Sequence, residues 1–293
     1  MSRIFIIGAT GGVGHRLHPL LTKAGHEVLG LHRKDEQAEV LKNAGVTPVK
    51  GDIMEMSKDD FANAMAGCDV VVFSAGAGGG GWDKTEGIDG KGAEQAIAAA
   101  QEQGIKRFYL VSVVPDAGRN ADLGDGFENY MKIKKRVDVT LAASDLDWVI
   151  LRPGTLKDDD GNGRVTAGPV VTYGDVARDN VAATLAALID TPALRREIVE
   201  VMNGKTPVRD AIAALASIGD RRAVEVRTPR AVPAPGPDPR RRPPGRQRHR
   251  HRRHRGSAAA RTGRRLAATD RPLGRHHGRG PGARRVRDRT RRG

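Results

Sequence analysis

Arg3-Ile-Phe-Ile-Ile7 followed by Gly8-Ala-Thr-Gly11-Gly-Val-Gly14 is the stretch that decides how this chain folds. The first five residues are almost entirely apolar, which is typical of a parallel strand buried on both faces. Apolar residues then recur at helical spacing, at Val13, Leu17 and Leu21. A strand, a glycine turn and a helix in this order predict the first unit of an alternating α/β sheet.

The same alternation continues through most of the chain. Apolar runs predict strands at 28–31, 46–50, 69–73, 108–112 and 148–151, separated by helical patterns at 36–43, 61–66, 90–103 and 130–143. Later patterns predict short strands at 164–167 and 169–172, a helix over 175–189, a strand at 197–202 and a helix over 207–215. Right-handed crossovers then predict an α/β, doubly wound parallel sheet, the Rossmann fold, as one domain with small C-terminal elements on the substrate side. Pro19 predicts a kink in the first helix, or a helix that starts after Gly12.

The end of the chain differs sharply from the body in charge. Residues 221–293 contain 25 arginines, four acids and no lysine, a net charge of +21, whereas residues 1–220 carry −6. The tail also lacks Ile, Phe, Tyr, Trp and Met, so it cannot bury enough apolar surface to offset its chain entropy. We therefore predict a Rossmann domain over 1–216 and a disordered Arg/Pro/Gly-rich tail over 217–293.

Two explanations of the tail are open. Arginines bind nucleic-acid phosphates, but a tail without aromatic residues has nothing on which bases can stack, which disfavours a nucleic-acid partner. Arg, Gly, Pro and Ala share GC-rich codons, so we favour a shift of reading frame near residue 217. The mass of the protein from its native source distinguishes the two explanations, because a mass equal to the 31.4 kDa of the full chain would exclude a shift of reading frame.

Composition narrows the class of protein further. A single cysteine, Cys68, excludes a disulfide framework and a Cys-rich zinc site, and no other spacing of ligand residues indicates a metal. No apolar run approaches the roughly 20 residues that span a bilayer, and the first residues do not read as a signal peptide. We expect a cytoplasmic protein with no membrane partner. The sequence does not decide its oligomeric state.

The glycine turn carries the first chemistry. Glycines between a strand and a helix let an anion approach the backbone amides and the positive end of the helix dipole, where larger side chains would block it. In this context the spacing predicts a bound dinucleotide diphosphate, with a plain glycine turn as the alternative. The predicted phosphate-binding residues are Gly8, Thr10, Gly11, Gly12, Val13 and Gly14.

The end of the second strand carries positive charge. NAD-specific sites usually place an acid there to bind the ribose 2′-hydroxyl, whereas this run is Leu31-His-Arg33-Lys34. Cations attract a 2′-phosphate, so Arg33 predicts NADP as the cofactor, with NAD possible. A solvated basic turn would have the same sequence.

Further segments follow the glycine turn in an order known from one family. They are Gly51–Ile53, Phe73–Gly76, Asp89–Ala93, Arg107–Ser112, Tyr130–Lys134 and Leu151–Gly154. With them the chain resembles the atypical short-chain dehydrogenases/reductases, particularly the small NAD(P)-binding oxidoreductases related to NmrA-like and biliverdin-reductase-B-like proteins. The resemblance covers roughly residues 1–215 and implies NADP bound across the carboxyl ends of the strands.

The resemblance also implies roles for single residues along the cofactor. Asp52 and Ile53 would flank the adenine, although a carboxylate that only caps its loop would look the same. Ser74, Ala75 and Gly76 would line the ribose and the diphosphate.

Tyr130 and Lys134 match the family's catalytic Tyr-xxx-Lys pair. The resemblance implies that the lysine lowers the pKa of the phenol and holds the nicotinamide ribose, while the phenol protonates a carbonyl. Ser112 would hydrogen-bond the same carbonyl. The pattern departs at Val113, where relatives often have another serine, and a solvated basic helix face is the alternative.

These roles predict an NAD(P)-dependent oxidoreductase that transfers a hydride from NADPH to a small-molecule acceptor, a carbonyl, a quinone or a related compound. The incomplete catalytic set leaves two alternatives. One is a regulator that senses NADP without turnover, and the other is an epimerase or dehydratase that uses the nicotinamide as a transient oxidant. The sequence does not identify the substrate.

Overall fold

The computed structural model describes residues 1–115, 117–118 and 121–226. Its strands are β1 (Arg3–Ile7), β2 (Glu27–His32), β3 (Thr47–Lys50), β4 (Val70–Phe73), β5 (Arg107–Val111), β6 (Asp147–Pro153), β7 (Thr155–Lys157), β8 (Arg164–Gly168), β9 (Asp175–Ala177), β10 (Glu197–Asn203) and β11 (Thr206–Pro207). Its helices are α1 (Gly14–Lys23), α2 (Asp35–Asn43), α3 (Lys58–Ala64), α4 (Trp82–Lys84), the π-helix η1 (Thr85–Gly92), α5 (Ala93–Glu102), α6 (Gly124–Ala142), α7 (Arg178–Ile189) and α8 (Val208–Val226).

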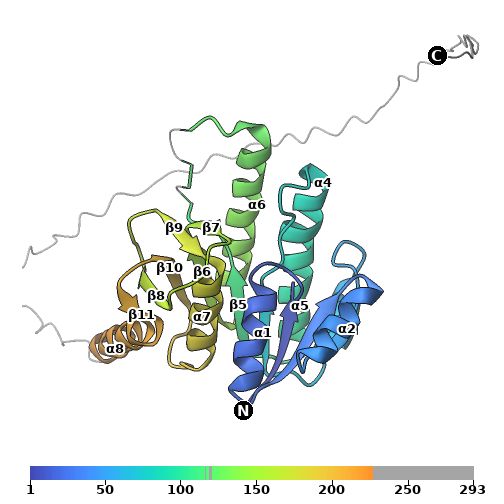
Figure 1. The fold of residues 1–293 in the computed structure, drawn as a ribbon, viewed down its shortest axis with the longest axis horizontal. Coiled ribbons are helices and arrows are strands. Elements are labelled where there is room, and N and C mark those ends of the chain that lie inside the picture. The colour runs from blue at the N-terminus through green and yellow to red at the C-terminus, as the bar shows by residue number, and fades with distance from the viewer. Residues whose placement is uncertain (116, 119–120, 227–293) are drawn as a thin grey trace, which may run out of the picture. The chain divides into compact units, whose positions relative to one another are not determined.

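One sheet organises the described residues, with the strand order β11-β8-β10-β6-β5-β4-β1-β2-β3. Its strands from β3 through β1 to β6 and β10 are parallel, and β8 is antiparallel to β10. The strand order reverses between β1 and β4, which is where Rossmann folds bind their ligands. The predicted doubly wound Rossmann fold is confirmed (Figure 1).

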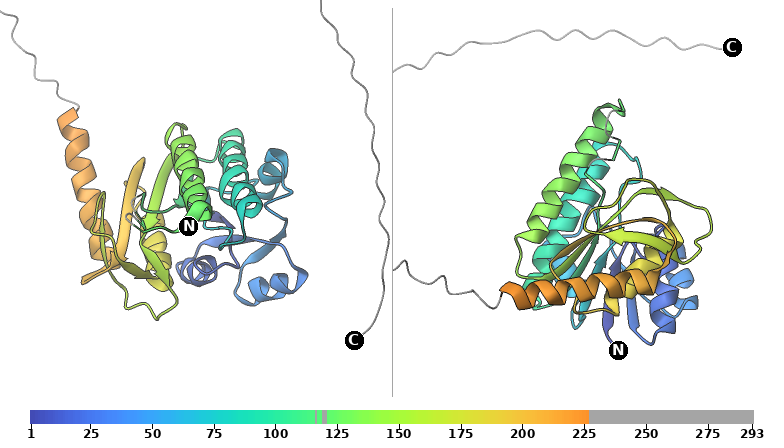
Figure 2. Two further views of the ribbon diagram at one scale, coloured as in Figure 1. Left: turned by 90° about the horizontal axis from the view of Figure 1, so that it is seen from above. Right: turned by 90° about the vertical axis from the view of Figure 1, so that its left-hand side faces the viewer.

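Alternate residues of each strand enter two separate cores, one on each face of the sheet. Ile4 and Ile6 of β1 belong to the core that packs on α1, α2, α7 and α8, and Phe5 and Ile7 belong to the core on α3, α5 and α6. Figure 2 shows helices on both sides of the sheet. This explains the unbroken apolar run of residues 4–7, because a strand covered on both faces has no solvent side.

In the C-terminal third of the chain, the structure differs from several predicted elements. Residues 175–177 form strand β9 rather than the start of the predicted helix, which begins at Arg178. Residues 169–172 do not form the predicted strand. The last helix continues from Val208 to Val226, so the predicted boundary at 216/217 lies within α8. The predicted disorder from residue 227 onward lies outside the described residues.

Two helices of the fold are irregular. α1 starts at Gly14, after Gly12 as Pro19 predicts, and Pro19 lies inside it. The pattern over 90–103 becomes a regular α-helix only from Ala93, because residues 85–92 form a π-helix. Residue 92 has no room for a side chain, because a Cβ on Gly92 would stand 2.3 Å from Cγ2 of Ile53. Wide turns of this kind are rare and occur mainly at functional sites.

Candidate active site

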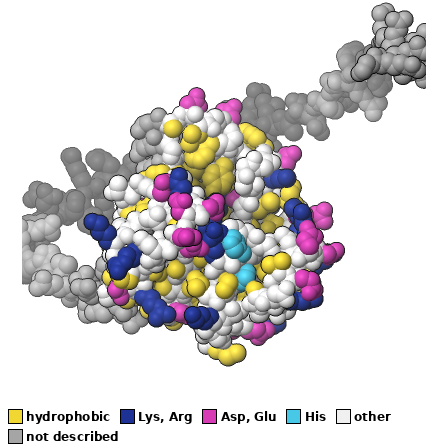
Figure 3. All heavy atoms as spheres, in the orientation of Figure 1, with side chains coloured by type: hydrophobic (Ala, Val, Ile, Leu, Met, Phe, Trp, Pro, Cys, Tyr) yellow, Lys and Arg dark blue, Asp and Glu magenta, His cyan; other side chains and the backbone are white. Residues whose placement is uncertain are grey.

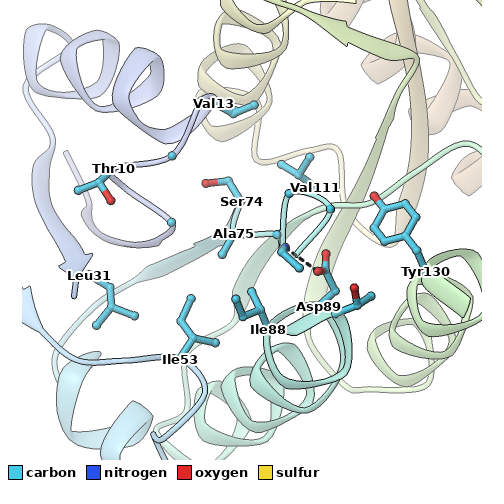
Figure 4. A pocket seen from close by; sticks show the side chains of 18 of the residues that line it. Thr10, Val13, Leu31, Ile53, Ser74, Ala75, Ile88, Asp89, Val111 and Tyr130 are labelled. Carbon is cyan, nitrogen blue, oxygen red and sulfur yellow. Dashed lines mark hydrogen bonds between the residues drawn. The ribbon is translucent and has the colours of Figure 1, made fainter. Parts of the chain in front are cut away.

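A cleft of about 770 Å³ opens at the carboxyl ends of β1, β2, β4 and β5. Figure 4 shows Thr10 and Leu31 toward one end, Tyr130 at the other, and Ser74 and Ala75 between them. The predicted site residues that line it are Gly8, Thr10, Gly11, Gly12, Val13, Arg33, Asp52, Ile53, Ser74, Ala75, Gly76, Ser112, Tyr130 and Lys134. Gly14 is the one predicted site residue that does not line the cleft.

The glycine turn is packed so closely that side chains would not fit. Gly8 has φ +92°, and a Cβ on it would lie 2.6 Å from the backbone nitrogen of Ala75. A Cβ on Gly14 would lie 2.1 Å from the Gly8 carbonyl oxygen. The Gly11 amide donates to that same oxygen over 3.0 Å, which closes the turn. The cradle therefore fits the diphosphate of a dinucleotide, which needs bare backbone at the start of a helix.

At one end of the cleft, Arg33 and Asp52 face each other. Their closest charged atoms, Nη1 and Oδ2, are 3.8 Å apart, and the Arg33 side chain is 57% exposed. The other Asp52 oxygen accepts a hydrogen bond from the Met54 amide over 3.0 Å. Asp52 thus caps its loop and also keeps an oxygen near Arg33. The Arg33 guanidinium is also exposed to solvent at this end of the cleft.

The sequence analysis missed Gln37, which shapes this end. Its Oε1 atom accepts hydrogen bonds from the Arg33 and Lys34 amides, and its Nε2 atom donates to Oγ1 of Thr10 over 3.2 Å. Gln37 therefore ties the β2–α2 loop to the glycine turn. A glutamine at the third position of a helix is a known capping residue, so the sequence did contain this signal.

At the opposite end, Lys134 is buried and bonded to other groups. Its Nζ atom donates to the Val111 carbonyl over 2.9 Å and lies 3.6 Å from Oδ1 of Asp89. Both side chains are at most 3% exposed. Asp89 Oδ2 in turn accepts from the Ala77 amide over 2.8 Å, the contact dashed in Figure 4. The Lys134 charge is thus balanced inside the protein by Asp89.

This pairing changes what Tyr130 can do. Burial raises the pKa of the Tyr130 phenol, and the nearby carboxylates of Asp89 and Asp138 raise it further. The net shift is opposite in direction to the lowered pKa that the resemblance to the family implies. A phenol with a raised pKa is protonated at neutral pH, so Tyr130 carries a proton in this structure.

Ser112 adds a second polar group at the Tyr130 end of the cleft. Its side chain is buried, and its Oγ atom has no hydrogen-bond partner. A buried hydroxyl without a partner costs free energy, which a bound cofactor or substrate oxygen would offset. Its amide donates to the Leu151 carbonyl over 2.8 Å, so β6 holds the residue in place.

Apolar side chains enclose the space around these polar groups. Phe127 and Tyr130 form a tilted ring pair with centroids 6.2 Å apart, and Ile88, Val111 and Leu156 also line the cleft. Figure 3 shows hydrophobic side chains gathered in a hollow beside α6. Sequence analysis missed Ile88, Phe127, Leu156 and Arg178 because they come from loops, short elements and the ends of distant ones.

The described part of the chain contains neither a cluster of metal ligands nor a membrane-spanning helix. Over residues 1–115, 117–118 and 121–226, no group of three His, Cys, Asp or Glu side chains could hold a metal ion. In the same ranges, no helix is both long and apolar enough to cross a membrane.

Comparisons with known proteins agree with this geometry. Residues 8–192 match the model of a family described as NAD(P)H-binding. A protein of Bacillus subtilis (strain 168), named as an uncharacterized sugar epimerase, is 36% identical over 215 residues, 73% of this chain and 100% of that protein.

Two solved structures are also similar. One, from Bacillus halodurans and provisionally assigned to the NAD-dependent epimerases/dehydratases, is 33% identical with a TM-score of 0.67, and covers 73% of this chain and 100% of its own. An oxidoreductase from Lactococcus lactis is 27% identical with a TM-score of 0.65, and covers 73% and 97%. With its glycine cradle and Rossmann strand order, the chain belongs to the NAD(P)H-binding family of atypical short-chain dehydrogenases/reductases.

Proposed function

We propose that this protein is an NADPH-dependent reductase of a small apolar carbonyl compound, a quinone or a related conjugated acceptor. The observation that carries the proposal is the reaction end of the cleft. There a protonated phenol, Tyr130, and an unpartnered hydroxyl, Ser112, line one space with apolar walls. These walls favour an uncharged, flat acceptor, because a charged one would lose its hydration.

When bound, NADPH supplies the hydride. Tyr130 donates its proton to the oxygen of the acceptor, and Ser112 Oγ donates a hydrogen bond to the same oxygen. The tyrosinate recovers a proton from water, which its raised pKa favours. Lys134, which Asp89 and Val111 hold in place, would bind the nicotinamide ribose, as the resemblance to the family implies.

Two other functions would use the same cleft. An epimerase first removes a proton from a substrate hydroxyl, and Tyr130 would have to act as the base in that step. The name of the Bacillus subtilis relative makes sugar epimerisation the second candidate. A regulator that binds NADP without turnover is the third.

The first prediction tests the reaction. Purified protein should oxidise NADPH in the presence of quinone, aldehyde or ketone acceptors, followed at 340 nm. Tyr130→Phe should lower turnover of aldehydes and ketones by roughly 10²- to 10⁴-fold and leave the Kd for NADPH unchanged. The reduction rate should not fall between pH 6 and pH 9, because the raised pKa keeps the phenol protonated.

Three other outcomes would contradict this reaction or this role. Equal rates for the wild type and Tyr130→Phe would remove Tyr130 from the mechanism. Tight NADPH binding without turnover of any acceptor would favour the regulator. Interconversion of sugar epimers with no net use of NADPH would favour the epimerase.

The second prediction concerns the cofactor. We propose NADP rather than NAD because the Arg33 guanidinium is exposed at the end of β2. Arg33→Asp places a second carboxylate beside Asp52 and should weaken NADP⁺ binding at least about tenfold, which is 1.4 kcal/mol. NAD⁺ affinity should stay equal or improve. Lys42→Asp, on the far end of α2, is the matched control, and unchanged NADP⁺ affinity in Arg33→Asp would refute the assignment.

A further inference from the structure

A guanidinium group lies directly on the glycine turn. Arg178 is the first residue of α7, and its Cδ and Nε atoms lie 2.8 Å from the point where a Cβ on Gly12 would stand. The Arg178 side chain lines the same cleft as the turn. Because Gly12 has no side chain, the guanidinium can approach the backbone that cradles a phosphate.

The other cations that line the cleft stand at its two ends. Arg33 lies at the end of β2 near Asp52, and Lys134 is buried against Asp89. Among the described lining residues, Arg178 is therefore the cation beside the turn itself. Arginine suits this position, because its planar fork makes strong, often bidentate hydrogen bonds to phosphate oxygens.

Arg178 already holds an anion that belongs to the protein. Its Nη1 atom lies 2.9 Å from Oδ1 of Asp158, and Arg16 Nη2 lies 3.7 Å from the same oxygen. The Asp158 side chain is 76% exposed. Because the carboxylate is exposed to solvent, its ion pair with Arg178 contributes little to stability, and a phosphate oxygen can replace the carboxylate at little cost.

The small second sheet explains why these two residues meet. β7 and β9 pair in parallel, with Lys157 opposite Ala177. The next residues, Asp158 and Arg178, therefore leave the sheet side by side at its carboxyl end. The pairing of β7 with β9 therefore positions Asp158 and Arg178 next to each other.

We propose that Arg178 binds the diphosphate of the dinucleotide, and that Asp158 is an internal competitor that the diphosphate displaces. Before binding, Asp158 keeps the guanidinium extended over the glycine turn. After binding, phosphate oxygens take the place of its carboxylate. The proposal rests on dinucleotide binding and is independent of the acceptor and of turnover.

Calorimetry with two probes tests the role of Arg178. NADP⁺ contains the diphosphate, whereas adenosine 2′-monophosphate keeps the 2′-phosphate and lacks the diphosphate. Arg178→Gln should weaken NADP⁺ binding by about 10- to 100-fold and leave adenosine 2′-monophosphate unchanged, which also shows that the variant is folded. Arg33→Gln should weaken both probes. Arg195→Gln, which removes an exposed guanidinium outside the cleft lining, should change neither.

A second variant tests the competition. Asp158→Asn should tighten NADP⁺ binding by up to about fivefold, and Asp158→Asn combined with Arg178→Gln should bind as Arg178→Gln does. Wild-type NADP⁺ affinity in Arg178→Gln, or an equal loss for both probes, would overturn the role of Arg178. Unchanged or weaker NADP⁺ binding in Asp158→Asn would overturn the competition. Failure to turn over any acceptor would count against the proposed reaction alone and would not alter these binding results.

Discussion

Gly14→Ala should severely weaken dinucleotide binding, although Gly14 does not line the cleft. A Cβ on Gly14 would stand 2.1 Å from the Gly8 carbonyl oxygen and 2.8 Å from Cα of Ala9. Both neighbours are backbone, so α1 must move away from β1. Because the carbonyl of Gly8 also closes the phosphate-binding turn, the amides that cradle the diphosphate move with it.

The expected loss is at least about 100-fold in the Kd for NADP⁺, or 2.7 kcal/mol. Calorimetry measures it directly. Overpacking at such a contact also lowers stability by about 1–3 kcal/mol, which thermal unfolding reports. Gly174→Ala is the matched control, since a Cβ there meets no atom within 4 Å. NADP⁺ affinity in Gly14→Ala equal to that of the control would mean that the turn does not hold the diphosphate.

Asp89→Leu should be the most destabilising of the substitutions considered for this protein. It removes the carboxylate that balances the buried Lys134 ammonium and also the acceptor for the Ala77 amide. Removing one partner of a buried ion pair costs about 3–5 kcal/mol, because the remaining charge is left uncompensated. Urea unfolding at pH 7 measures the loss.

Two companion variants separate charge from packing. Asp89→Asn keeps an oxygen for the Ala77 amide, so it should lose stability through charge alone. Asp89→Leu combined with Lys134→Met removes both charges and should recover much of the stability lost in Asp89→Leu. Equal stability of Asp89→Leu and this double variant would show that the ion pair is unimportant and that packing decides.

The first half of the fold and the cofactor end of the cleft were predictable from sequence because their signals are local. The strand, the glycine turn and α1 lie within 21 consecutive residues, from Arg3 to Lys23. Arg33 follows the second strand directly, and Ser74 to Gly76 follow the fourth. In a parallel sheet these ends meet at one edge, so order along the chain suffices to bring them together.

The reaction end was less predictable because its chemistry depends on distant contacts. The spacing of Tyr130 and Lys134 indicates a shared helix face, yet it does not reveal that Asp89, 45 residues before Lys134, engages the lysine. Asp89 is buried within the π-helix, whose wider turns leave no clear periodicity in the sequence. The direction of the Tyr130 pKa shift follows from this burial and from these carboxylates, which only the tertiary structure brings together.

The same reasoning explains the error at residues 175–177. Asp175, Val176 and Ala177 fit a helical pattern together with the residues that follow, but their partner is β7, about 20 residues earlier. Pairing with β7 outweighs local propensity. The helix therefore begins at Arg178, and this start places the Arg178 side chain over the glycine turn.

The short β7 strand connects the wall around the reacting groups to the ion pair at the glycine turn. Leu156 forms part of the wall around the reacting groups, and Asp158, two positions later, contacts the cation on the glycine turn. An insertion or a shift of register in this strand alters both at once. Evolution of a new acceptor preference through β7 would therefore carry a change in cofactor affinity with it, and the two traits would be inherited as one.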